Sequence, residues 1–218
     1  MTEVKKIMDT KLFHTDDNEI AEAGEILRNG GLVAFPTETV YGLGASAFDS
    51  DAAKKIYAAK GRPSDNPLIV HICDKGQIKD IAEEIPESAK KVIDNFMPGP
   101  VTIILKKKSV VPNDVTAGLN TVAIRFPLHE TAQKLIKAAG VPIAAPSANL
   151  SGKPSPTKAK HVVKDMTGRI DAIIDGGECN VGVESTIVDF TGEKPVILRP
   201  GGVTYDDLKG IGLDVEID

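Results

Sequence analysis

Tryptophan is absent from this sequence of 218 residues, and it holds only three tyrosines, six phenylalanines and two cysteines. A platform that stacks single-stranded nucleic acid would need more aromatic side chains than these. Cys73 and Cys179 stand far apart, and neither has a second cysteine nearby to form a zinc or redox pair. We therefore expect two reduced thiols. The four histidines are scattered, so we expect no dedicated metal site in the protein.

Long apolar runs are also missing. No stretch approaches the roughly 18 consecutive apolar residues that a membrane-spanning helix needs. The first residues, MTEVKKIMDTKLFH, lack the apolar core of a secretory signal. We therefore expect a cytoplasmic protein with no membrane part. The net charge of −5 also argues against a broad basic field for nucleic acid, although a local basic cleft is compatible with it.

The composition that is present is typical of a globular protein, with 41% hydrophobic and 26% charged residues. Helical periodicity and strand-like apolar runs follow one another without strict alternation. This mixture predicts an α/β fold with a twisted, mixed sheet and flanking helices. The predicted helices cover residues 17–28, 49–60, 86–96, 129–139, 157–166 and 205–208. The predicted strands lie within residues 32–36, 68–73, 101–106, 121–127, 141–146, 171–177, 185–190 and 195–199.

We expect one domain over residues 1–218, with a core at about 12–205 and a tail or the start of a linker at 206–218. Several familiar signatures are absent, among them the P-loop, the GxSxG elbow and the HExxH pair. The segment GLGASA at 42–47 fits GxGxxA, but it lies well beyond the strand at 32–36 instead of in the first turn after it. We therefore place it in a loop. The lysine run at 106–108 is expected to be a solvated strand edge.

Polar loops adjoin several of the predicted strands. Three of them follow strands, namely PTETVYGLG at 36–44, PSANLSGKPSP at 146–156 and RPGG at 199–202. A fourth, KGRPSDNPL at 60–68, precedes a strand. Loops at strand ends are where α/β sheets build ligand sites.

The charges in these loops favour an anionic ligand. Arg62 and Arg199 can each form a forked contact with phosphate oxygens, and Lys60 supplies a compact positive charge. Arg125 lies inside the apolar run TVAIRFP, where it must reach a partner or a cleft, and it suits a carboxylate or a phosphate. His71 is equally compatible with a core position and with a ligand contact. Glu38 and Glu184 could help carry Mg²⁺.

Five segments carry a resemblance to a known family. They are KGRPSDNPLIVHI, PTETVYGLG, PSANLSGKPSP, GVESTIVD and ILRPGG. Together they resemble the signatures of the threonylcarbamoyl-AMP synthase family, also called the YrdC-like domain, over about residues 12–205. The resemblance implies a YrdC/RibB-like twisted open sheet around a large concave cavity. The long members of that family carry a further carboxy-terminal domain, which we expect to be missing here.

The resemblance also implies a nucleotidyltransferase reaction. L-Threonine, bicarbonate (or CO₂) and ATP, which brings Mg²⁺ with it, would give L-threonylcarbamoyladenylate and pyrophosphate. A separate transferase complex would then complete the t⁶A modification at position 37 of tRNAs that read ANN codons. The alternative is a double-stranded RNA-binding module that uses the same basic cavity, and a weak RNA contact is compatible with both.

The family pattern assigns roles to individual residues. Lys60 and Arg62 are expected to act in catalysis, and Asn149 to support its loop. The expected threonine contacts are Thr39, His71, Arg125, Ala145 and Ser185. The expected ATP contacts are Lys60, Arg62, Asn66, Thr121, Ser147, Ser155 and Arg199.

Overall fold

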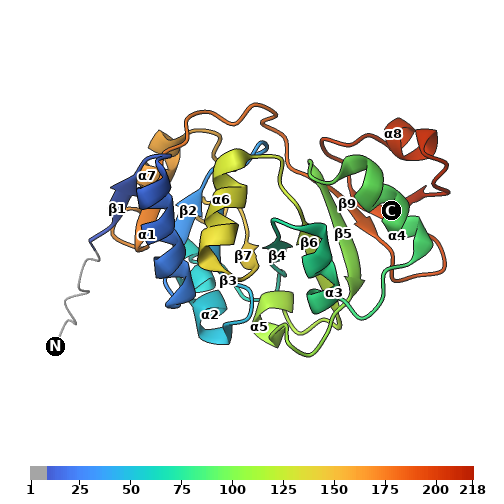
Figure 1. Cartoon of the computed structure of the whole chain (residues 1–218), viewed down its shortest axis with the longest axis horizontal. Helices are drawn as coiled ribbons and strands as arrows, with labels where there is room; N and C mark the ends of the chain where they lie inside the picture. The colour runs from blue at the N-terminus through green and yellow to red at the C-terminus, as the bar shows by residue number, and fades with distance from the viewer. Residues whose placement is uncertain (1–8) are drawn as a thin grey trace.

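A computed structural model describes residues 9–218, in which eleven strands form one sheet (Figure 1). The strand order is β1-β8-β2-β3-β7-β4-β6-β5-β9-β10-β11, and neighbours pair in both parallel and antiparallel fashion. This confirms the predicted mixed sheet. The strands are β1 (Lys11–Phe13), β2 (Val33–Phe35), β3 (Gly42–Ser46), β4 (Ile69–His71), β5 (Val101–Lys106), β6 (Thr121–Arg125), β7 (Ile143–Ala145), β8 (Ala172–Ile174), β9 (Thr186–Asp189), β10 (Val196–Arg199) and β11 (Glu216–Ile217).

The longer helices begin and end where the sequence predicts. Asp16 caps the first helix by accepting hydrogen bonds from two backbone N–H groups, and Asp49 caps the second in the same way. Gly61 ends the second helix in the left-handed conformation. The helices are α1 (Asp17–Arg28), α2 (Ser50–Lys60), α3 (Ile78–Ile81), α4 (Glu87–Phe96), α5 (Asn113–Thr116), α6 (Glu130–Ala139), α7 (Ala159–Met166) and α8 (Tyr205–Gly210), with a 3₁₀ turn at Lys75–Gln77.

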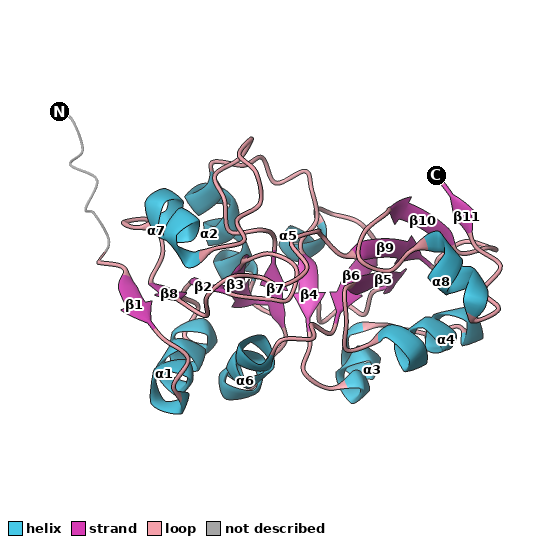
Figure 2. Cartoon of the chain, turned by 90° about the horizontal axis from the view of Figure 1, so that it is seen from above, coloured by secondary structure: helices cyan, strands magenta, loops and turns pink. Residues whose placement is uncertain are grey.

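Helices cover both faces of the sheet. Seen from above, α1 and α6 lie on one side of β2, β3 and β7, and α2 and α7 lie on the other (Figure 2). One cluster of buried apolar side chains lies between the sheet and α1 and α6, and a larger one includes residues of α2, α7, α4 and α8. Helices α4 and α8 lie near the end of the sheet that holds β9 and β10 (Figures 1 and 2). Helices therefore pack against both faces of the part of the sheet that holds β2, β3 and β7.

The placement of residues 42–47 in a loop is wrong, because Gly42–Ser46 form β3, an interior strand of the sheet whose residues are all buried. The strand carries glycine where its neighbours come close. A Cβ atom on Gly44 would lie 2.7 Å from Cγ2 of Ile143 and 2.9 Å from the ring of Phe35. These glycines remove the apolar alternation by which a strand is normally recognised.

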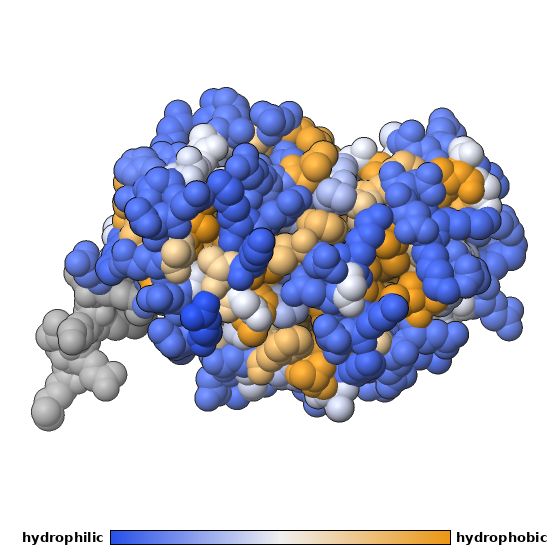
Figure 3. All heavy atoms as spheres, viewed as in Figure 1, coloured by the Kyte–Doolittle hydropathy of each residue, from blue (hydrophilic) through white to orange (hydrophobic). Residues whose placement is uncertain are grey.

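The carboxy-terminal residues are part of the fold instead of a tail. After α8, β11 pairs in parallel with β10, and Leu208, Leu213 and Val215 are buried in the core. Hydrophilic side chains cover most of the face seen in Figure 3, and apolar residues gather along its middle. Within residues 9–218, no helix combines the length and the apolar character needed to cross a membrane.

The contact between α1 and α6 gives a test of the packing. A Cβ atom on Gly24 would lie 2.7 Å from both C and Cβ of Ala138. Alanine favours a helix over glycine by about 1 kcal/mol, whereas overpacking costs about 1–3 kcal/mol. We expect Gly24→Ala to lower the free energy of unfolding by about 1–2 kcal/mol in chemical denaturation.

Gly210 is the matched control, because no atom lies within 4 Å of a Cβ built on it at the end of α8. Gly210→Ala should leave stability unchanged or raise it slightly. Equal effects of the two substitutions would show that α1 and α6 can separate without cost.

Candidate active site

A cavity of about 310 Å³ opens where the polar loops meet the middle of the sheet. This volume lies at the lower end of the range for small-molecule sites. All five of the expected threonine contacts line it, and so do four of the expected ATP contacts. They are Thr39, His71, Arg125, Ala145 and Ser185, together with Arg62, Asn66, Ser147 and Arg199. The tertiary structure thus gathers residues that lie up to 160 positions apart in the chain.

Two rows of side chains on one face of the sheet form the floor. The strand register places His71 beside Arg125, and Arg125 beside Thr102. The second row lies two residues away along each strand, on the same face of the sheet. It consists of neighbouring side chains, namely Ala145, Ile69, Ala123 and Ile104. The floor is therefore polar and charged at one end and apolar beside it. Residue-by-residue reading missed Ile69, Ala123 and Ile104, although their two-residue spacing from His71, Arg125 and Thr102 is the signal for them.

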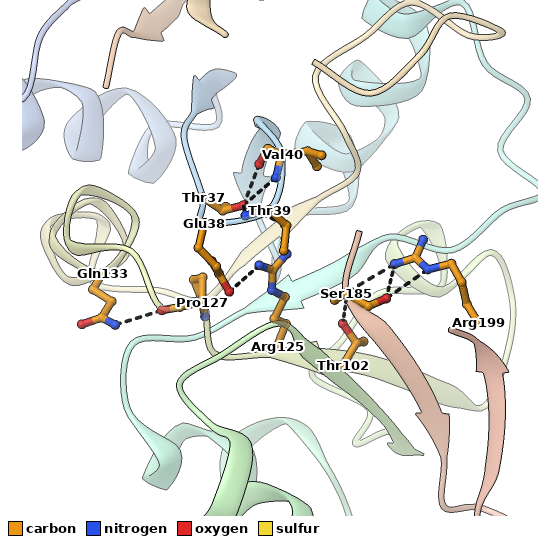
Figure 4. Close-up of polar contacts among 10 residues, drawn as sticks. All are labelled: Thr37, Glu38, Thr39, Val40, Thr102, Arg125, Pro127, Gln133, Ser185 and Arg199. Carbon is orange, nitrogen blue, oxygen red and sulfur yellow. Dashed lines mark hydrogen bonds and ion pairs between the residues drawn. The ribbon is translucent and has the colours of Figure 1, made fainter. Parts of the chain in front are cut away.

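Arg125 is almost completely buried and is paired with Glu38 in the loop between β2 and β3. The Nη2 atom of Arg125 lies 2.7 Å from Oε1 of Glu38, and the two side chains are 5% and 7% exposed. Figure 4 shows the carboxylate reaching the guanidinium from the side of Thr37 and Pro127, and Ser185 on the other side. The sequence predicts that the charge of Arg125 needs a partner or a cleft, and it has both: Glu38 is the partner and the cavity is the cleft.

His71 is buried on β4 and stays neutral. Its Nδ1 lies 3.0 Å from the carbonyl oxygen of Ile69, and its ring meets the ring of Phe35 edge-on. A carbonyl oxygen only accepts, so Nδ1 carries the proton. Burial lowers the pKa of His71 to about 3, and the positive charge of Arg125 adds to this effect. His71 can therefore take part in hydrogen bonding without a charge.

A second arginine is held at the other side of the cavity. Nε and Nη2 of Arg199 donate to the carbonyl oxygen of Ser185 at 3.1 and 2.9 Å, and Nη1 contacts the carboxylate of Glu184. Glu184 also accepts a hydrogen bond of 2.8 Å from Ser155. Ser155 itself is outside the cavity lining, because its hydroxyl is directed at Glu184. The hydroxyls of Ser185 and Thr102 lie 2.8 Å apart, which ties this loop to the floor.

Lys60 differs from its expected position. It is 3% exposed and outside the cavity lining, and its ammonium donates to the backbone carbonyls of Ser147 and Asn149. Burial lowers the pKa of Lys60 to about 8, and the charge of Arg62 contributes. Asn149 donates to the carbonyls of Leu150 and Lys153, which confirms its expected role as a loop support. Both residues hold the loop that brings Ser147 to the cavity.

Thr121 also lies outside this cavity, in a neighbouring hollow that Lys106 and Asn120 help to line. Thr121 precedes Ala123 and Arg125 at two-residue intervals on β6, so the same face of the sheet continues from the cavity to the hollow. Lys106, on β5, stands directly opposite Thr121. A ligand longer than the cavity would follow this face.

Acidic groups are few in this region. Among the described side chains that line the cavity, Glu184 is the only carboxylate. Within residues 9–218, no group of three or more His, Cys, Asp or Glu side chains is arranged to hold a metal ion. Any divalent ion in the cavity would therefore need most of its ligands from a bound molecule.

Comparison with known proteins adds independent findings. The Sua5/YciO/YrdC family model, described as "Telomere recombination", matches residues 25–201. A Bacillus subtilis protein named threonylcarbamoyl-AMP synthase is 55% identical, over 96% of this chain and 61% of its own length. A Pyrococcus abyssi protein of the same name is 54% identical, over 91% of this chain and 58% of its own length. This chain therefore spans about three fifths of these relatives.

A solved structure supports the same relationship. The P. abyssi Sua5 protein complexed with L-threonine superimposes with a TM-score of 0.94 at 51% identity. The match covers 96% of this chain and 63% of that chain. The fold around the cavity is therefore shared with a protein whose crystal holds L-threonine.

The neutral state of His71 has a measurable consequence. The unfolded chain has the ordinary histidine pKa of 6.5, so it binds a proton that the folded protein does not bind between pH 6.5 and about 3. The contribution of His71 to stability is complete above pH 6.5 and is lost as the pH falls toward 3. We expect the NMR signals of the His71 ring to show no titration midpoint between about pH 5 and about pH 8. A midpoint inside that interval would contradict the buried, neutral state.

Proposed function

The chain belongs to the Sua5/YciO/YrdC family, and from this membership we propose that it is a threonylcarbamoyl-AMP synthase. The proposed reaction joins L-threonine, bicarbonate and ATP to give L-threonylcarbamoyladenylate, pyrophosphate and water. The observation that carries the proposal is that one small cavity holds positively charged side chains at two separate positions. Arg125 stands on its floor, Arg62 stands on the loop after α2, and Arg199 ends β10 at its side.

Threonine is assigned to the end of the floor that holds Arg125. A guanidinium suits the α-carboxylate, and the hydroxyl groups of Thr39 and Ser185 with the neutral ring of His71 suit the threonine hydroxyl. Ala145 leaves room for the threonine methyl. The L-threonine complex of the P. abyssi relative supports this choice of amino acid.

ATP is assigned to the loop side of the cavity. Arg62 and Arg199 suit the phosphates, and Ser147 and Asn66 supply neutral hydrogen-bonding groups. Ser155 and Thr121 are proposed to meet parts of ATP that extend beyond the cavity. Lys60 contributes by fixing the loop that carries Ser147, since its ammonium is already held by that loop.

The chemistry requires positioning and charge neutralisation more than a protein nucleophile. The neutral amine of threonine attacks the carbon of bicarbonate, and loss of water leaves an N-carboxylate; with CO₂, the amine releases a proton and no water is formed. An oxygen of that carboxylate attacks the α-phosphorus of ATP, and the bond to pyrophosphate breaks. Two anions must approach each other, so the cations in the cavity lower the barrier by holding both.

Mg²⁺ would arrive with ATP and neutralise part of the phosphate charge. Glu184 is the residue that fits it, because it is the only carboxylate among the described residues of the cavity lining. Glu184 would have to release Arg199, which the phosphates could then bind. No other described residue of the lining offers the ion a carboxylate oxygen.

We place this activity in the cytoplasm, where a transferase complex would use the product for t⁶A modification of tRNA. The alternative function, double-stranded RNA binding, is not favoured. Modules that recognise duplex RNA contact roughly 16 base pairs across a broad surface. A cavity of about 310 Å³ with an apolar strip in its floor suits a small molecule instead.

Omission of single substrates tests the proposal. We expect pyrophosphate and threonylcarbamoyladenylate to form only when ATP, L-threonine and bicarbonate are all present. Pyrophosphate release and mass spectrometry of the nucleotide product measure this directly. Equal release without threonine would identify a different ATP-dependent enzyme, and salt-sensitive retention of duplex RNA without turnover would favour the alternative.

We expect Arg62 and Arg125 to bind different substrates. Loss of a charge-assisted contact weakens binding by roughly 10- to 150-fold. We expect Arg62→Ala to raise the KM for ATP by such a factor with a small change for threonine. Arg125→Ala should raise the KM for threonine first. Steady-state kinetics with each substrate varied in turn will measure both, and proportional losses for the two substrates in both variants would refute the division.

A further inference from the structure

Glu38 is a buried acid with no part in the reaction steps given above. It lies in the loop between β2 and β3 and is 5% exposed. Its nearest charged partner is Arg125, with 2.7 Å between Oε1 and Nη2. Thr37 and Thr39, on either side of it, line the cavity, whereas Glu38 is directed behind the lining. It therefore meets the arginine from the side that a ligand does not reach.

The pair is held by charge more than by hydrogen bonding. Despite the short distance, the contact lacks the angles of a hydrogen bond. Both oxygens of Glu38, and Nε and Nη2 of Arg125, are enclosed without a hydrogen-bond partner among the described residues. Nη1 of Arg125 is not enclosed in this way. The carboxylate thus occupies one side of the guanidinium and leaves another toward the cavity.

The surroundings explain why such a partner is needed. Burial lowers the pKa of Arg199, Glu184 opposes this, and the charge of Arg125 adds to the lowering, so the two guanidinium groups act on each other. Each arginine has its own carboxylate, Glu38 for Arg125 and Glu184 for Arg199. A buried arginine without its acid would be strongly disfavoured and would turn toward other acceptors.

We infer that Glu38 is the positioning residue for carboxylate recognition: it fixes Arg125 so that the guanidinium presents its free side to the carboxylate of the substrate. This inference rests on the proposed function, because it takes an amino acid as the ligand. Glu38 does not touch the substrate. Its removal acts through Arg125, on the carboxylate contact alone.

Discrimination between L-threonine and L-threoninamide isolates that contact, because the amide lacks the negative charge. Isothermal titration calorimetry of the whole chain gives the affinity for each. We expect the wild-type protein to prefer threonine. In Glu38→Gln, which keeps the shape and removes the charge, this preference should fall by roughly 10-fold or more. Affinity for threoninamide should change little.

Three further variants complete the experiment. Glu38→Asp keeps the charge but moves it back by one methylene, so it should retain part of the preference. Arg125→Ala should lose the preference, and adding Glu38→Gln to it should cause no further loss of preference. Glu87→Gln is the matched control, since this exposed glutamate on α4 pairs only with Lys90 among the described residues. It should behave as the wild type.

The outcomes separate the two proposals. If the wild-type protein binds threonine selectively and folded Glu38→Gln keeps the same preference, the role of Glu38 is refuted and the proposed function stands. If the wild-type protein binds no threonine, the proposed function fails and the inference fails with it. Should circular dichroism show that Glu38→Gln is unfolded, Glu38→Asp decides: an unchanged preference overturns the inference, and a reduced one with unchanged threoninamide affinity supports it.

Discussion

The burial of a positive charge in the middle of the sheet is the constraint on which this site depends. Arg125 occupies a strand position between Ile124 and Phe126, where an apolar residue would be the ordinary choice. Charges are tolerated at such depth only when they are paired. Glu38 provides the partner from a loop some ninety positions earlier in the chain. That loop follows β2, so the site requires β2, β3, β7, β4 and β6 to be assembled in order.

Around this pair, the loops are held by polar contacts as well as by apolar packing. Lys60 and Asn149 tie together the segment that carries Ser147, and Glu184 joins Ser155 to Arg199. These contacts place hydrogen-bonding groups before any ligand arrives, which lowers the cost of ordering them on binding. The protein is acidic overall, with a net charge of −5, yet its cavity gathers three arginines. Local placement of charge, not total charge, decides which ligand the cavity attracts.

Most elements of the fold follow from local signals. Capping aspartates, helical periodicity and apolar runs locate α1, α2, α4 and α6 and the strands β2, β4, β5 and β6. β3 lacks the apolar alternation of an ordinary strand, because its glycines leave room for Phe35 on the preceding strand β2 and for Ile143, about a hundred positions later in the chain. β11 is not predicted from the sequence because two residues are too few to show the alternation of a strand. It is a strand through its pairing with β10.

The sequence alone determined the residue types in the polar loops. It also determined the order of the motifs that carry the family resemblance. They sufficed to favour an anionic ligand and to name nine of the residues that line the cavity. Only the tertiary structure decided which of those residues face the cavity. Lys60, Ser155 and Thr121 lie outside the lining, whereas Ile69, Ala123 and Ile104 belong to it. The physical reason is that side-chain direction depends on strand register and on partners far away in the chain: Lys60 is turned by the carbonyls of Ser147 and Asn149, and Glu38 is recruited by Arg125.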